Sequence, residues 1–331
     1  MQITSAPRDV AWEPLRRFLA AHQVPGREWV DPADGDHVRV VDSAAGPVLV
    51  RVRWSGPVVS LHAADGSAVP ADVLADVDAA VRRWLGWDLD PAPAVDAFAG
   101  DPLLGPLVAA RPGLRIPGSA DGAETALFTV LGQQVSLAAA RTFAGRLVAQ
   151  WSTDVDGRVA GVPVSGPLDL TRIAAAPAEQ FRASLGVTGS RGRTLQGLAG
   201  ALADGLRLAP GGEQDRAATR AALLALPGIG PWTVEYLTLR CLRDTDGFPA
   251  GDLVLRRVLA ESDAPTPDLV KTAVVPPSRR RVAPSRDHVE GSARPARPAL
   301  PSERDVRLRA QAWRPFRGFA LLHLWTAAVF V

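Results

Sequence analysis

The sequence predicts an N-terminal α+β domain built on an antiparallel sheet, followed by a mostly α-helical domain of two subdomains. Three observations support this fold class. A length of 331 residues is room for about two domains. Stretches of alternating apolar and polar residues, separated by turn-like segments, lie between residues 37 and 62. From about residue 120 onward, apolar residues recur at helical spacing to the end of the chain.

The first domain is expected over residues 1–95. A helix is predicted near its start, because Leu15, Phe18 and Leu19 would share one helix face. The alternating stretches that follow predict an antiparallel meander, since short segments rich in glycine, alanine and proline join them. In chain order, the expected elements are a helix over 10–22, strands over 37–41, 48–54 and 58–62, and a helix over 70–86.

The second domain is expected over residues 96–331, and no internal repeat is visible in it. Its apolar spacing is helical nearly throughout. The strongest helical patterns cover 121–132, 136–151, 169–176, 191–204, 214–226 and 231–243, followed by a short helix around 252–261 and a stretch over 303–331 with a break near Pro315.

Residues 262–302 differ from the rest of this domain. Proline and arginine are dense there and no hydrophobic period is visible, which predicts a disordered basic insertion. Residues 271–310 carry 10 basic and 4 acidic side chains. A basic arm that contacts phosphates would explain the segment. An artefact of reading GC-rich DNA in a wrong frame would also explain it, and both explanations stay open.

Composition excludes several classes of protein. Cys241 is the only cysteine, so an intramolecular disulfide, a zinc site with two or more cysteines and a cysteine-ligated iron–sulfur cluster are excluded. No run of about 18 apolar residues predicts a membrane span, and the N-terminus lacks the pattern of a signal peptide. We therefore expect a cytoplasmic protein that makes no membrane contact. The net charge of +2 is by itself weak evidence for a nucleic-acid partner.

The sequence Leu-Pro-Gly-Ile-Gly-Pro-Trp-Thr over residues 226–233 lies between two helical patterns. Gly228 and Gly230 allow a tight turn with positive φ, and Pro231 suits the first position of the second helix. Unpaired N–H groups at that helix start would form an anion site that fits a DNA phosphate. The plainer interpretation is a helical turn with glycine for geometry, but the full motif favours a DNA-binding helix-hairpin-helix at about 214–243.

Two further features next to this motif point to chemistry. Trp232 and Tyr236 are four residues apart and share a helix face, which fits either core packing or an aromatic wall that stacks a flipped base. Asp252 stands where a helix should begin. An aspartate there is a good N-cap, so its local setting alone favours a structural role over a catalytic one.

The order of these features resembles the helix-hairpin-helix (HhH-GPD) DNA glycosylases. Four stretches narrow the resemblance to the 3-methyladenine DNA glycosylase II (AlkA-type) family, and they are 109–118, 131–136, 227–236 and 313–325. The resemblance covers most of 109–260 and 311–330 and is looser over 1–108. It implies that the helical part is an HhH-GPD glycosylase domain with the cleft between its two subdomains.

The resemblance also implies roles for individual residues. Gln134 falls at the tip between two helices, where the family inserts a wedge into the gap left by the flipped base. Glutamine can fill that gap and hydrogen-bond the orphaned base. The implied site consists of Asp252 as the catalytic residue, Trp232, Tyr236 and Trp325 in the base pocket, Gln134 as the wedge, and Gly228, Gly230 and Thr233 in DNA phosphate binding.

The resemblance implies a monofunctional glycosylase of base excision repair that hydrolytically removes alkylated purines of the 3-methyladenine and 7-methylguanine type from duplex DNA. Trp232 occupies the place where strand-nicking members carry a lysine, so lyase activity is not expected. No metal or other cofactor is expected, apart from a monovalent cation that often assists such hairpins. The expected protein is a bacterial monomer associated with the nucleoid.

Two other functions stay open. The chain could be a hairpin DNA-binding protein without catalysis, in which Asp252 only caps a helix. It could also be a glycosylase for another damaged base. Other polar residues are weaker candidates for a function. We expect His323 to satisfy a buried hydrogen bond and not to act in catalysis. Arg191 and Arg193 fit either a phosphate contact or a solvated helix start.

Overall fold

The N-terminal part of the chain forms a five-stranded antiparallel sheet with the strand order β1-β5-β4-β3-β2. The structure is a computed structural model that describes residues 2–7, 9–54, 58–63, 67–153, 158–159, 162–262 and 299–329. The antiparallel sheet predicted from the sequence is confirmed. Its elements and the two helices beside it are β1 (Gln2–Ser5), α1 (Trp12–Ala21), β2 (Glu28–Val30), β3 (His37–Ser43), β4 (Gly46–Arg53), β5 (Val58–Ala63) and α2 (Ala71–Leu85).

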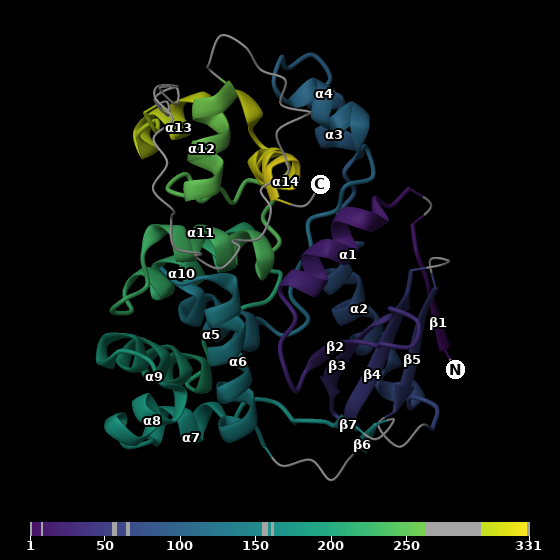
Figure 1. Ribbon diagram of the computed structural model, residues 1–331, viewed down its shortest axis with the longest axis vertical. Helices are drawn as coiled ribbons and strands as arrows, with labels where there is room; N and C mark the ends of the chain where they lie inside the picture. The colour runs from purple at the N-terminus through teal and green to yellow at the C-terminus, as the bar shows by residue number, and fades with distance from the viewer. Residues whose placement is uncertain are drawn as a thin grey trace, which may run out of the picture.

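Both faces of the sheet are covered at its centre. In the β3–β4 ladder, Val41 pairs with Val48, and Val40 pairs with Leu49. Because side chains alternate across a strand, Val41 and Val48 join the core formed with α1 and α2, while Val40 and Leu49 pack on the other face with Val164. Figure 1 shows α1 and α2 beside the sheet.

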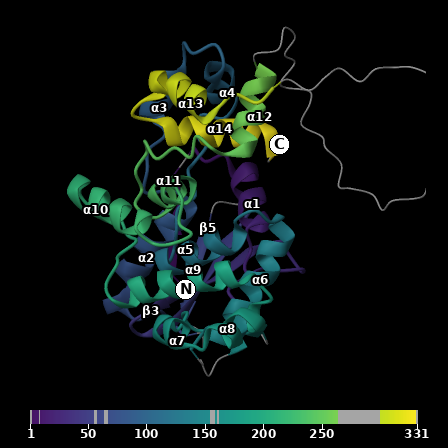
Figure 2. The same cartoon turned by 90° about the vertical axis from the view of Figure 1, so that its left-hand side faces the viewer.

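The remaining described chain is mostly helical and packs as two groups, with α11 between them in Figure 2. No helix in the described ranges is long and apolar enough to cross a membrane. The first group consists of α5 (Gly122–Gly132), α6 (Leu137–Trp151), α7 (Leu170–Ala175), α8 (Ala178–Leu185), α9 (Gly189–Ala203), α10 (Glu213–Leu224) and α11 (Pro231–Arg240), with a two-stranded ribbon of β6 (Arg158–Val159) and β7 (Val162–Pro163). The second group consists of α3 (Ala92–Phe98), α4 (Leu104–Ala110), α12 (Leu253–Ser262), α13 (Glu303–Arg309), the 3-10 turn η1 (Ala310–Trp313) and α14 (Arg317–Val329).

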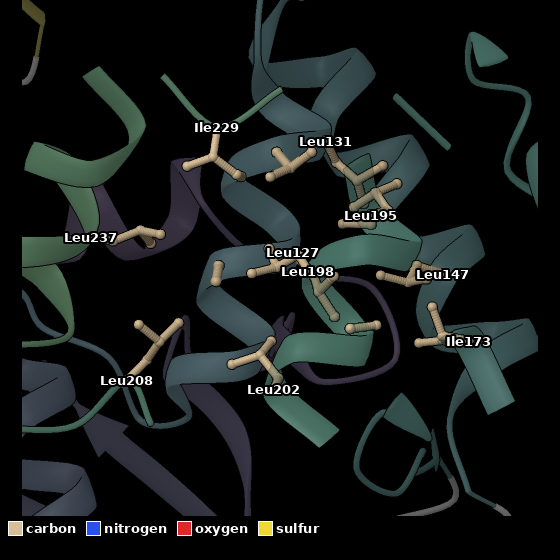
Figure 3. Close-up of a cluster of buried hydrophobic side chains, with 14 of the residues drawn as sticks. Leu127, Leu131, Leu147, Ile173, Leu195, Leu198, Leu202, Leu208, Ile229 and Leu237 are labelled. Atoms are coloured by element: carbon tan, nitrogen blue, oxygen red, sulfur yellow. The ribbon is translucent and has the colours of Figure 1, made fainter. Parts of the chain in front are cut away.

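Each group has its own hydrophobic core. In the first, Leu127 and Leu131 of α5 lie against Leu198 and Leu195 of α9, and all four are fully buried (Figure 3). In the second, α3 and α4 pack with the C-terminal helices although about 200 residues of sequence separate them. The mostly helical domain of two subdomains that the sequence predicts is thus confirmed.

The predicted basic insertion over 262–302 lies mainly outside the described residues, which omit 263–298. At its edges, Ser262 ends α12, and Ser302 is the N-cap of α13, with a capping box in which Ser302 and Asp305 exchange hydrogen bonds. The helical stretch predicted over 303–331 is interrupted before Pro315, as expected, and resumes as α14.

A buried group of charges ties α5 to the sheet. Glu124 of α5 accepts a hydrogen bond from Arg27 Nε at 3.1 Å and another from Arg39 of β3. Burial by itself raises the pKa of Glu124, but the two guanidinium groups outweigh it and hold that pKa below its ordinary value. The carboxylate therefore stays ionised. Removing it would leave two buried arginines with one carboxylate partner each, Asp42 for Arg27 and Glu28 for Arg39.

Three histidines with a lowered pKa predict how stability depends on pH. Burial lowers the pKa of His22, His37 and His323 from 6.5 to about 4 in each case. Below pH 6.5 the unfolded chain binds protons that the folded chain excludes, so the free energy of unfolding should fall as pH drops from about 6.5 toward 4. Above pH 6.5 both states are neutral at these positions and the effect vanishes.

Urea unfolding between pH 5 and pH 7.5 measures this dependence. We expect a slope of about 1.4 kcal/mol per pH unit for each histidine below pH 6.5. The variant His323→Asn should lower the slope by about one proton. A flat stability profile across pH 5–6.5 would contradict the assignment of these histidines as neutral in the folded state.

Candidate active site

A cavity of about 680 Å³ opens where the two helix groups meet the N-terminal domain. Side chains from α1, the sheet, α5, α6, α11 and α14 line it. Trp232, Tyr236, Asp252 and Trp325 are all part of its wall. The four residues that the sequence singled out for catalysis and the base pocket are therefore brought together, although 93 positions separate the first from the last.

The Asp252 carboxylate is held by donors from three helices. Its Oδ1 atom accepts the Leu255 backbone N–H at 2.9 Å and Trp325 Nε1 at 2.9 Å. Its Oδ2 atom accepts Trp232 Nε1 at 3.2 Å. Asp252 thus does cap α12, but the cap uses only one of its oxygens. Three N–H donors suit the ionised carboxylate, which can only accept hydrogen bonds.

The three aromatic side chains form a continuous surface beside this carboxylate. Trp232 and Tyr236 stack with ring centroids 5.2 Å apart and an interplanar angle of 8°. Tyr236 and Trp325 lie 6.3 Å apart at 48°. Because both indoles also donate to Asp252, the aromatic surface and the carboxylate have a fixed relative position. Such a site can hold a flat, apolar-faced ligand against one negative charge.

The hairpin between α10 and α11 turns at Gly228, whose φ is +86°. A Cβ atom at this position would lie 2.0 Å from Thr194 Oγ1, so the close approach of α9 also requires glycine. The expectation of positive φ at Gly230 is wrong: its φ is −98°, because it is the N-cap of α11. Neither φ nor space requires glycine there, since among the described residues nothing lies within 4 Å of an added Cβ.

The Thr233 hydroxyl is not placed to contact a DNA phosphate. It is only 2% exposed, and its Oγ1 atom accepts a hydrogen bond from Gln133 Nε2 at 3.0 Å. Any phosphate contact of this residue would have to use its backbone N–H in the first turn of α11. Gly228, by contrast, is exposed on the hairpin.

Gln134 lies in the loop between α5 and α6. It is exposed, and its φ of +55° is one of two positive values outside glycine in the described ranges. A bulky side chain with positive φ is uncommon and is held there by its surroundings. The loop thus presents Gln134 outward at a tip, as a wedge would require.

Sequence reasoning missed a group of residues that line the cavity next to Tyr236. Arg240 donates a hydrogen bond to Tyr236 Oη, and its guanidinium carbon lies 4.8 Å from the Phe18 ring centroid. His22 stacks on Phe18 with ring centroids 4.1 Å apart. Burial, with help from Arg240, lowers the His22 pKa to about 4, so the imidazole is neutral near pH 7. Only the four-residue spacing of Tyr236 and Arg240 on one helix could have indicated this contact.

Other candidates lie outside the cavity wall. His323 is buried at 2% exposure and bonds the Leu107 backbone, as expected for a core histidine. Within the described ranges, no cluster of three or more histidine, cysteine, aspartate or glutamate side chains could hold a metal. The monovalent cation expected at the hairpin would use backbone carbonyls and stays a prediction.

Comparisons with known proteins show which proteins the chain resembles. Residues 7–121 match the family model described as the AlkA N-terminal domain. DNA-3-methyladenine glycosylase 2 of Escherichia coli is 31% identical over 223 residues, which are 67% of this chain and 63% of that protein. A probable bifunctional transcriptional activator/DNA repair enzyme AlkA of Mycobacterium tuberculosis is 35% identical over 323 residues, 96% of this chain.

The chain belongs to the AlkA family. It spans about half the length of the Mycobacterium tuberculosis AlkA, 54% of that protein. Among solved structures, a 3-methyladenine DNA glycosylase from Archaeoglobus fulgidus has the same fold, with a TM-score of 0.71 at 18% identity over 98% of this chain and 97% of that one. The AlkA N-terminal domain match includes α1, so this domain contributes Phe18 to the cavity wall.

The two hairpin glycines predict opposite responses to alanine. Gly228→Ala should destabilise the protein by about 1–3 kcal/mol, because the new Cβ atom collides with Thr194 and φ is positive. Gly230→Ala is the matched control, with open space and negative φ, and should cost less than about 1 kcal/mol. Urea unfolding of both variants measures the difference, and equal losses would show that the Gly228 conformation is not required.

Proposed function

We propose that this chain is a monofunctional DNA glycosylase of base excision repair. It flips alkylated purines of the 3-methyladenine and 7-methylguanine type out of duplex DNA and removes them by hydrolysis, leaving an abasic site. The observation that carries this proposal is the Asp252 carboxylate, held by two indole N–H groups at the edge of an aromatic cavity. Its partner is duplex DNA in the bacterial cell, and it acts as a monomer.

The Asp252 carboxylate can stabilise the positive charge that develops on the sugar during the reaction. As the bond between base and sugar breaks, the sugar becomes oxocarbenium-like and carries positive charge. An ionised carboxylate fixed beside the anomeric carbon stabilises that charge without reorganising during the reaction. In this proposal Asp252 also orients or deprotonates the attacking water. Its donors from Trp232 and Trp325 prevent the side chain from swinging away.

The aromatic surface fits the proposed leaving group. An N3- or N7-alkylated purine is cationic, and electron-rich rings attract a cation by about 0.5–2 kcal/mol each when desolvated. Arg240 already lies 5.4 Å from the Tyr236 ring centroid, so Trp232 and Trp325 are the faces available to the base. The positive charge also makes the alkylated base a good leaving group, which reduces the need for a protein acid.

Among the described residues no lysine lines the cavity, and Lys271, the only lysine of the sequence, lies outside the described ranges. Trp232 occupies the position after the hairpin where a Schiff-base lysine would be needed, so that position supplies no amine to attack the sugar. Water is the nucleophile in this proposal, and the DNA strand stays intact.

One observation favours a second function. Asp252 does cap α12 through Leu255, as it would in a hairpin DNA-binding protein without catalysis. That function requires the hairpin and the cap but neither indole donor. The two tryptophan contacts therefore favour the glycosylase, and base release distinguishes the two functions.

We expect the wild-type chain to release methylpurines from methylated duplex DNA and to produce strand breaks only after alkali. Asp252→Asn keeps a capping residue but loses the charge, and it should release base at least about 100-fold more slowly. Liquid chromatography of released bases, with an alkali step on parallel samples, measures both points. Binding of undamaged duplex should weaken steeply with salt.

The matched control is Asp169→Asn, because Asp169 caps α7 with its Oδ1 atom and does not line the cavity. Its release rate should equal that of the wild type. Salt-sensitive binding with no base release by the wild-type chain would favour the non-catalytic function. Strand breaks without alkali would contradict the monofunctional mechanism.

A further inference from the structure

Gln133, next to the exposed tip residue, connects the wedge loop to the hairpin. Its Nε2 atom donates to the Gly228 carbonyl oxygen at 3.2 Å and to Thr233 Oγ1 at 3.0 Å. Both N–H groups of this amide are therefore used, and both bonds go to the phosphate-binding segment. The two segments are about 100 residues apart in the sequence.

Helix α9 holds the same two segments from the other side. Arg191 in its first turn donates to the Gln133 carbonyl oxygen. Thr194, one turn later, donates to the Pro227 carbonyl oxygen at 3.0 Å. The loop and the hairpin thus share a direct link through Gln133 and an indirect link through α9. Arg191 therefore makes a hydrogen bond within the protein. The sequence had suggested either a phosphate contact or a solvated helix start, and neither interpretation included this bond.

We propose that Gln133 is a positioning residue that sets how deeply the wedge at Gln134 enters DNA when the hairpin grips the backbone. The inference rests on the proposed function, because it concerns the extrusion step of that reaction. A hairpin fixed on a phosphate provides a reference point on the DNA. A wedge rigidly tied to that point enters the base stack at a defined place, and small misplacements of such groups are costly.

The contacts fit positioning better than core stability. Gln133 is only half-buried, so truncating it opens no cavity in a hydrophobic core. Its side-chain donors reach the Gly228 carbonyl oxygen on the hairpin and the buried Thr233 hydroxyl in the first turn of α11, and not its own helix. Gln134 needs support from a fixed neighbour, because a residue other than glycine keeps a backbone φ of +55° only when the surrounding structure holds it.

The test follows the wedge directly and does not require catalysis. A duplex carries a tetrahydrofuran abasic analogue with 2-aminopurine opposite it, and insertion of the wedge beside this orphaned base changes its fluorescence. Wild-type protein should give a clear change. Gln133→Ala should lower the fraction of complexes with an inserted wedge about tenfold, the effect of losing roughly one net hydrogen bond, while hairpin binding to plain duplex stays within about twofold.

The matched control is Gln196→Ala. Gln196 of α9 also donates from Nε2 to two carbonyl oxygens, those of Ile173 and Ala176, but does not touch the hairpin. It should lose similar stability and keep the wild-type fluorescence change. Gln133→Met, which keeps the side-chain length, replaces Gln133→Ala if the alanine variant does not fold. Adding Thr233→Val to Gln133→Ala should cost less than about twofold more, because Gln133→Ala has already removed the Gln133–Thr233 hydrogen bond.

A second readout separates positioning from a general loss of activity. Single-turnover release of an alkylated base should slow about tenfold in Gln133→Ala when the lesion faces a pairing base, and change less than about twofold when it faces an abasic analogue. An unchanged fluorescence response in Gln133→Ala, or equal slowing in both contexts, would overturn the inference. If the wild type releases no base but the fluorescence difference appears, the proposed function fails and the positioning role stands.

Discussion

The structure of the site depends on one carboxylate that three N–H donors share. Asp252 joins α12 through Leu255, α11 through Trp232 and α14 through Trp325. Because an ionised carboxylate accepts but does not donate, each donor is satisfied without competing for a proton. The same three bonds fix the two indoles that bound the cavity. Capping, pocket shape and electrostatics are therefore consequences of a single side chain at the junction of two helix groups.

The N-terminal domain is part of this site and not an appendage to it. Phe18 and His22 line the cavity, and Arg240 links Phe18 to Tyr236 through a cation–π contact and a hydrogen bond. Deeper, the Glu124 carboxylate holds α5 against the sheet through buried arginines. Breaking one partner of such a buried pair typically costs about 3–5 kcal/mol, so the relative position of sheet and cavity is strongly held. The wedge loop begins at the end of this same helix.

Local patterns in the sequence predicted the elements that local interactions determine. The alternation of apolar and polar residues predicted β3–β5, the apolar spacing predicted α5 and α9, and the glycine motif predicted the turn at Gly228. The edge strands β1 and β2 were not, because three or four residues carry too little alternation. Contacts between distant segments, such as Arg240 with Phe18 or Gln133 with Gly228, leave no periodic signal at all. The resemblance, and not periodicity, led to Trp325, and no pattern distinguished Gly230 at a helix N-cap from a glycine with positive φ.

The central claim is that Asp252 acts on the substrate and does not merely cap a helix. Single-turnover base release by Asp252→Ser tests it directly, because serine is an equally good N-cap but has no carboxylate. The account predicts a folded protein, destabilised by no more than about 2 kcal/mol, that binds duplex DNA but releases no methylpurine. Wild-type release by Asp252→Ser would contradict the claim and leave Asp252 as a structural residue.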